Sequence, residues 1–173
     1  MKSNMKKPII CVDMDNVLCD YRSLYIEKIK EYPQVIYPQS QYGYFLELKP
    51  MPFAIEAFNW MVTWADVWIL TAPSYMNPNC LAEKNYWVRQ HLGIEYTKKI
   101  IMAHDKSMVK GDYLIDDGIE NRQKEFDGVV IEFGSKRYLT WTEVYLFLKK
   151  EAVKNKWLHP KEAKFSRLDK YSK

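Results

Sequence analysis

Residues 8–12, Pro-Ile-Ile-Cys-Val, form a short apolar run that ends directly at Asp13. The run is rich in β-branched residues and follows Lys6-Lys7, so it predicts a buried strand rather than a helix. Because side chains two apart on a strand point the same way, Asp13 and Asp15 should project together beyond its carboxyl end. Open α/β sheets place their ligand sites at that edge. Two carboxylates held close together raise each other's pKa or bind a cation.

After residue 50, segments typical of strands alternate with segments typical of helices. The strand candidates are short apolar runs, and the helix candidates have apolar positions at helical spacing or a capping box. Strands are expected at 67–71, 99–103, 112–116 and 128–133, and helices at 53–64, 79–92 and 140–155. Buried strands that alternate with helices form a parallel sheet covered on both faces. The predicted fold class is therefore α/β, with a doubly wound, five-stranded parallel sheet.

Residues 16–50 interrupt this alternation. They contain one expected helix, at residues 21–31, and then a stretch over 32–44 that is rich in Pro, Gln and Tyr. Because this segment follows the first strand, it should lie above the carboxyl edge of the sheet as a small cap over the site. A chain of 173 residues is most simply one domain. We expect residues 1–155 to form that domain, cap included, and residues 156–173 to form a basic tail.

Charge and cysteine content narrow the functional classes. The tail holds six basic and two acidic residues, which accounts for the whole net charge of +4 and leaves the rest of the chain neutral. A neutral body disfavours nucleic acid as a partner. No apolar stretch reaches membrane-spanning length, and residues 1–7 are not followed by a signal-peptide core. Three widely spaced cysteines fit reduced thiols rather than a disulfide framework or a zinc site. We expect a cytoplasmic protein without a membrane partner, and the oligomeric state stays open, a homodimer included.

Polar side chains also follow three other predicted strands. Thr71 ends the second strand, Lys106 follows the third, and an acidic pair, Asp116 and Asp117, closes the fourth. In a parallel sheet these carboxyl ends lie along one edge. Taken singly, each has a simpler interpretation: a hydroxyl that caps a turn, a surface lysine, or a turn with Asp side chains bonded to backbone. Their joint occurrence in this order favours a site for phosphoryl transfer.

In this order the residues resemble the motifs of the haloacid dehalogenase-like (HAD) phosphatases. Those motifs are Asp-x-Asp, a Ser or Thr after the second strand, a Lys, and an acidic pair after the fourth strand. Within that superfamily, the chain is similar to the 5'(3')-deoxyribonucleotidases of the 5'-nucleotidase C family over roughly residues 8–150. The resembling stretches are residues 12–18, 45–52, 69–73, 83–88, 105–107, 114–117 and 139–141.

The resemblance implies a phosphomonoesterase that uses Mg²⁺ to hydrolyse nucleoside monophosphates, deoxyribonucleotides in particular. Asp13 would be the nucleophile that forms an aspartyl-phosphate, and Asp15 would act first as general acid and then as base. The metal would be held by the Asp13 side chain, the Asp15 backbone carbonyl and Asp117. Asp116 would hold a metal-bound water, although the two neighbouring aspartates could exchange these roles.

Four more residues belong to the candidate site, and two of them also have an alternative interpretation. Lys106 would offset the negative charge of nucleophile and phosphate, and Thr71 would donate a hydrogen bond to a phosphoryl oxygen. Lys84 has two interpretations, a contact to the phosphate or a solvated position on its helix. Phe45 is expected to line the pocket, where a nucleobase could stack, the alternative being that it packs the cap onto the core.

The rival functions are a phosphatase for another small phosphoester and, from a different class, a nucleic-acid-binding module that uses the basic tail.

Overall fold

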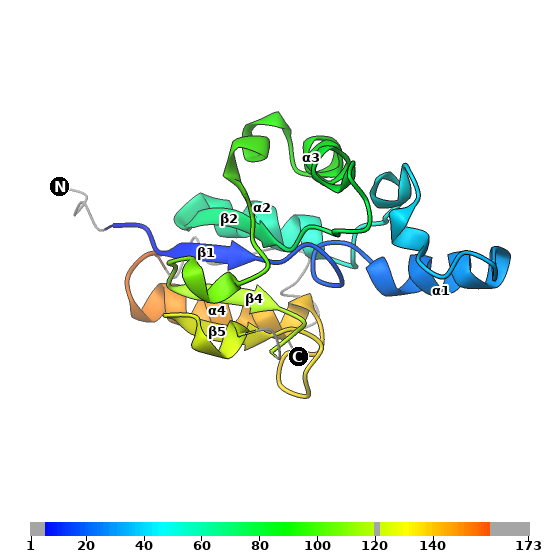
Figure 1. The fold of residues 1–173 in the computed structure, drawn as a ribbon. Coiled ribbons are helices and arrows are strands. Elements are labelled where there is room, and N and C mark those ends of the chain that lie inside the picture. Colours follow the sequence, from blue (N-terminus) through cyan, green and yellow to red (C-terminus); the bar gives the residue numbers. More distant parts are fainter. Residues whose placement is uncertain (1–5, 120–121, 160–173) are drawn as a thin grey trace.

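The centre of the molecule is a sheet of five parallel strands in the order β3-β2-β1-β4-β5 (Figure 1). The computed structural model describes residues 6–119 and 122–159. The strands are β1 (Ile9–Val12), β2 (Asp66–Thr71), β3 (Ile100–Met102), β4 (Tyr113–Asp116) and β5 (Val129–Glu132). β1 pairs with both β2 and β4, so it lies in the middle of the sheet. The five predicted strands and the α/β class are confirmed.

Four α-helices occur in the described residues, and each begins and ends within one residue of its expected range. They are α1 (Tyr21–Glu31), α2 (Ala54–Trp64), α3 (Cys80–His91) and α4 (Trp141–Lys154). Short 3₁₀ helices lie between them: η1 (Pro38–Ser40), η2 (Tyr44–Leu46), η3 (Ile94–Lys99), η4 (Lys106–Met108) and η5 (Gln123–Glu125). In the part of the chain that the structure describes, no helix has the length and apolar character needed to cross a membrane.

The two faces of the sheet are covered unequally. Alternate strand side chains enter two separate apolar clusters, because successive residues of a strand point to opposite faces. The larger cluster contains Ile10 and Val12 of β1 and the buried side chains of α2, α3 and α4. The smaller one contains Cys11 of β1 and is closed by Val109 and Phe126, which follow η4 and η5. Three α-helices therefore pack into one cluster, while loops with single 3₁₀ turns close the other.

Residues 16–50, which we call the cap segment, extend beyond the carboxyl end of β1 (Figure 1). The two ends of the segment lie side by side. The backbone N–H of Asp20 donates to the carbonyl of Lys49 at 2.8 Å, and that of Met51 donates to Leu18 at 2.9 Å. This pairing closes the base of the segment next to β1, and Trp87 of α3 also donates to the carbonyl of Leu48 at 2.7 Å. The domain boundaries remain a prediction, and most of the expected basic tail, residues 160–173, lies outside the described residues.

The last helix begins at the predicted capping box, which gives a first test of the fold. The Thr140 side chain accepts from the N–H of Thr142, and the Glu143 carboxylate accepts from the N–H of Thr140 at 2.8 Å. Thr140→Ala is expected to lower the free energy of unfolding by about 1 kcal/mol, because it leaves a helix N–H without its acceptor. The measurement is the melting temperature, which should fall by ~2–4 °C. Thr142→Ala is the matched control, and equal melting of the two variants would contradict the prediction.

Candidate active site

Asp13 lies just beyond β1, close to Lys106, which follows β3, and to Asp116, which ends β4. Its N–H donates to the carbonyl of Ile115 at 2.8 Å, so the backbone of Asp13 is held against β4. Its carboxylate Oδ1 is 2.8 Å from Nζ of Lys106 in η4. The same ammonium lies 2.5 Å from Oδ2 of Asp116, the last residue of β4. All three side chains are buried. The structure thus brings these predicted residues together.

Asp117 completes what we call the acidic cluster: Asp13, Asp116, Asp117 and the ammonium of Lys106. Carboxylate oxygens of the three aspartates lie within 4.8 Å of one another. Asp117 is the exposed member, and its Oδ2 accepts a hydrogen bond from the Asn16 side chain at 3.0 Å. Burial raises the pKa of Asp116 to about 6, and the neighbouring charge of Asp13 adds to this effect while Lys106 opposes it.

The acidic cluster fits a divalent cation. Three carboxylates face one ammonium, so negative charge is in excess in a largely buried place. Burial also raises the pKa of Asp117, whereas the hydrogen bond from Asn16 lowers it. The neighbouring charge of Asp13 raises the pKa of Asp116 and of Asp117 further, as crowded carboxylates do. A donor set made only of oxygens suits Mg²⁺. The residues present are therefore compatible with the expected metal.

Asp15 belongs to a second group, which we call the Lys84 cluster: Asp15, Thr71 and Lys84. Its Oδ2 is 2.7 Å from Nζ of Lys84, a residue of α3 that is completely buried. The same ammonium donates to Oγ1 of Thr71 at 2.8 Å and to the carbonyl of Ala72 at 2.9 Å. An ammonium carries three hydrogens, so these contacts use all of them. Lys84 is therefore not a solvated helix residue. Burial raises the pKa of Asp15, against the attraction of Lys84.

A cleft of about 300 Å³ opens beside Asp15. Its walls come from the cap segment and from the loops that follow β2 and β3, and they are rich in aromatic side chains. Apart from Asp15, the lining residues are Tyr21, Tyr37, Gln39, Phe45, Ala72, Pro73, Ser74, Tyr75, Met76 and His104. Phe45 lines the cleft, as the sequence suggested, and is also a buried member of the larger apolar cluster that the helices form with the sheet. The two interpretations of this residue therefore both apply.

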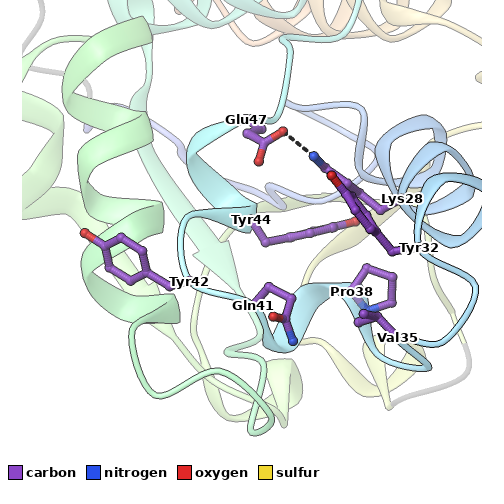
Figure 2. A pocket seen from close by; sticks show the side chains of 8 residues that line it. All are labelled: Lys28, Tyr32, Val35, Pro38, Gln41, Tyr42, Tyr44 and Glu47. Atoms are coloured by element: carbon purple, nitrogen blue, oxygen red, sulfur yellow. Dashed lines mark ion pairs between the residues drawn. The ribbon is translucent and has the colours of Figure 1, made fainter.

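A second cavity, of about 260 Å³, lies in the cap segment (Figure 2). Figure 2 shows the ion pair of Lys28 and Glu47 on one side of it and the ring of Tyr44 reaching across it, whereas Tyr42 points away. The remaining lining residues are Tyr32, Val35, Pro38 and Gln41. None of the lining residues belongs to the acidic cluster or the Lys84 cluster. Consecutive residues of η2, Tyr44 and Phe45, thus face two different cavities.

Three polar residues near the site were not singled out from the sequence. Asn16, with a φ of 57°, bridges Asp117 and the backbone N–H of Arg22. Gln123 is buried and donates to Oδ1 of Asp116 at 3.4 Å. Glu83 is buried on α3 beside Lys84. Asn16 carried a usable signal, because Asn directly after an Asp-x-Asp motif tolerates the left-handed conformation that a sharp turn needs. Glu83 lies in the stretch 83–88 that resembles the family, but nothing local marked it as buried, and Gln123 carried no signal.

The strand order, with the acidic cluster and the Lys84 cluster at the carboxyl ends of the strands, defines a haloacid dehalogenase-like phosphatase. A family model described as "5' nucleotidase, deoxy (Pyrimidine), cytosolic type C protein" matches residues 28–150. The chain therefore belongs to this family, and it is a phosphatase.

Curated relatives agree with the family. A putative 5'(3')-deoxyribonucleotidase of Vibrio phage KVP40 is 36% identical over 153 residues, which cover 84% of this chain and 86% of the relative. The cytosolic-type 5'(3')-deoxyribonucleotidase of Homo sapiens is 44% identical over 77 residues, 43% of this chain and 38% of the relative. The mitochondrial 5'(3')-deoxyribonucleotidase of Mus musculus is 30% identical over 139 residues, 62% of this chain and 63% of the relative.

Proposed function

We propose that this protein hydrolyses nucleoside monophosphates, deoxyribonucleotides in particular, to nucleoside and phosphate. The reaction would depend on Mg²⁺ and pass through an aspartyl-phosphate. The observation that carries the proposal is that Asp15, two residues from Asp13 of the acidic cluster, lines the aromatic cleft. A leaving group that is protonated by Asp15 must lie in that cleft, and its aromatic walls suit a nucleobase. The printed names of the relatives support the same substrate class.

The acidic cluster supplies the nucleophile and the metal ligands. When bound, Mg²⁺ would supply the positive charge that lets an anionic phosphate approach a carboxylate. Asp13 and the exposed Asp117 would hold it by their side chains, with the backbone carbonyl of Asp15. Asp116 is less free to serve, because one of its oxygens accepts from Lys106 and the other from the N–H of Gly118 at 3.0 Å. We therefore propose that Asp116 would hold a water bound to the metal rather than the metal itself.

Asp13 and Asp15 divide the chemistry between them. Asp13 attacks phosphorus, the bond to the leaving oxygen breaks, and Asp15 gives that oxygen its proton. Asp15 then accepts a proton from water as the water attacks the aspartyl-phosphate, which releases phosphate and restores Asp13. Asp15 must be protonated to act as the acid in the first step, and its burial raises its pKa, which favours the protonated form. Lys84 fixes the carboxylate that performs both transfers.

We propose different tasks for the two lysines because their contacts differ. In the described part of the chain, Lys106 binds two carboxylates and so keeps one ammonium hydrogen for a phosphoryl oxygen. All three ammonium hydrogens of Lys84 are donated, to Asp15, Thr71 and the carbonyl of Ala72, so Lys84 orients the acid rather than the phosphate. Thr71 accepts from Lys84, and its own hydroxyl hydrogen is left to donate to the phosphate.

The test is a substrate profile with and without metal. We expect phosphate release from deoxyribonucleoside monophosphates, assayed beside ribonucleotides, 3'-phosphates and sugar phosphates. EDTA should abolish turnover, and excess Mg²⁺ should restore it, because the carboxylates of the acidic cluster would otherwise repel the substrate. Absence of turnover on every nucleotide would contradict the proposal. Faster turnover of sugar phosphates than of nucleotides would instead favour the phosphatase for another small phosphoester.

A further inference from the structure

Helix α3 carries two consecutive buried charges, Glu83 and Lys84, that have different partners. Glu83 is 3% exposed and Lys84 is 0% exposed. Neighbouring residues of a helix point about 100° apart, so the two side chains leave the helix in different directions. Lys84 reaches the catalytic acid. The partners of Glu83 come from the cap segment and from the loop before α3.

Three N–H groups satisfy the Glu83 carboxylate. Oε1 accepts from the backbone N–H of Gly43 at 2.8 Å, and Oε2 accepts from that of Phe45 at 3.1 Å. The side chain of Asn77 donates to Oε2 at 3.3 Å and to the carbonyl of Gln41, also at 3.3 Å. In the ranges 6–119 and 122–159, no salt bridge to Glu83 occurs. A buried carboxylate without a cation is retained only where hydrogen bonds replace its water, and charge-assisted bonds are the strong ones.

The backbone of residues 43–45 is shaped to meet this carboxylate. Gly43 has a φ of +85°, a left-handed conformation that glycine adopts without the steric cost other residues would bear. That turn directs the N–H groups of Gly43 and Phe45 to the two oxygens of one side chain. The ring of Phe45 then covers Lys84, with Nζ 5.0 Å from the ring centroid. Glu83 and Lys84, which are adjacent on α3, therefore fix the wall of the cleft and the catalytic acid beside it.

We propose that Glu83 is a positioning residue that holds the turn 43–45 so that Phe45 forms a ready-made wall for the leaving group beside Asp15. The proposal rests on the nucleotidase function proposed above, in which the nucleoside fills that cleft. Glu83 touches neither the acidic cluster nor the cleft itself. It acts through Phe45, so it matters for binding of the nucleoside part and leaves the phosphate part unaffected.

The test is Glu83→Gln, which keeps the shape of the side chain but turns one acceptor into an N–H₂ that faces a backbone N–H. We expect the KM for a deoxyribonucleoside monophosphate to rise about 10- to 100-fold, the effect of losing a charge-assisted hydrogen bond. The inhibition constant of inorganic phosphate, which occupies only the phosphate site, should stay within about twofold. Glu27→Gln is the matched control, because Glu27 is exposed in the same cap segment.

A double-mutant cycle with Phe45→Ala separates positioning from general loss of structure. If Glu83 acts through Phe45, the double variant has the KM of Phe45→Ala alone, whereas independent effects multiply. Multiplying effects, or equal weakening of nucleotide and phosphate binding, would overturn the proposal. Should Glu83→Gln not fold, Glu83→Asp carries the same test, with a smaller rise in KM and unchanged phosphate inhibition. A wild-type protein that turns over no nucleotide would contradict the proposed function instead.

Discussion

Asp13→Asn is expected to lower kcat on the order of 10⁴-fold or more, the size of effect seen when a covalent nucleophile is removed. The amide oxygen of Asn does not attack phosphorus, so no aspartyl-phosphate forms. The amide oxygen can still accept from Lys106, which lies 2.8 Å from the present carboxylate. The fold should therefore survive. Phosphate release from the preferred nucleotide, with Mg²⁺ at saturation, gives the measurement.

The control for this experiment is Asp127→Asn, which removes the same charge at an exposed position. That variant should keep the full rate. Both variants should melt close to the wild-type temperature, which excludes unfolding as the cause of lost turnover. Asp13→Asn that retained more than roughly 1% of the rate would show that Asp13 is not the nucleophile, because loss of a nucleophile leaves far less.

Lys106→Met is expected to give the largest loss of stability, about 3–5 kcal/mol in the free energy of unfolding. Without this ammonium, the buried carboxylates of Asp13 and Asp116 face each other with no cation between them. The melting temperature should fall by roughly 10 °C. Urea unfolding with and without Mg²⁺ is the measurement, and Mg²⁺ should restore stability more in the variant than in the wild type.

Lys124→Met is the matched control, since Lys124 is exposed within η5 and its replacement should change stability by less than about 0.5 kcal/mol. Equal stability of the two variants would mean that the carboxylates around Lys106 are balanced in some other way. Equal rescue of wild type and variant by Mg²⁺ would contradict metal binding at the acidic cluster.

Apolar patterning predicted the elements of this fold well. β1 ends at Val12, directly before Asp13, and the strand ends at Thr71 and Asp116 were also read correctly, because short β-branched runs have few alternative structures. The parallel arrangement then follows, and with it the meeting of distant residues at one edge. The capping box at Thr140 was equally visible, since it depends only on local sequence.

The long-range partners of the charged residues on α3 could not be predicted. Lys84 and Glu83 are charged residues in a helix, and a charge that meets a partner far away in the chain looks the same as one that meets water. Asp15 lies 69 positions from Lys84, and Gly43 lies 40 positions from Glu83. The 3₁₀ helices were not predicted for a different reason: a single turn is too short to show a periodic pattern in the sequence. The unequal cover of the sheet follows from those turns, which replace helices between β3, β4 and β5.

The edges of the sheet have a consequence for the protein at high concentration. β3 and β5, which form these edges, are three and four residues long, whereas the longest strand, the six-residue β2, lies inside. A bare edge offers its unpaired amides and carbonyls to a strand of another molecule, and a short edge offers few of them. Copies of this chain therefore find little backbone with which to join sheet to sheet. The short edge strands therefore limit aggregation, although each of them pairs with a strand that carries a site residue, Thr71 in β2 and Asp116 in β4.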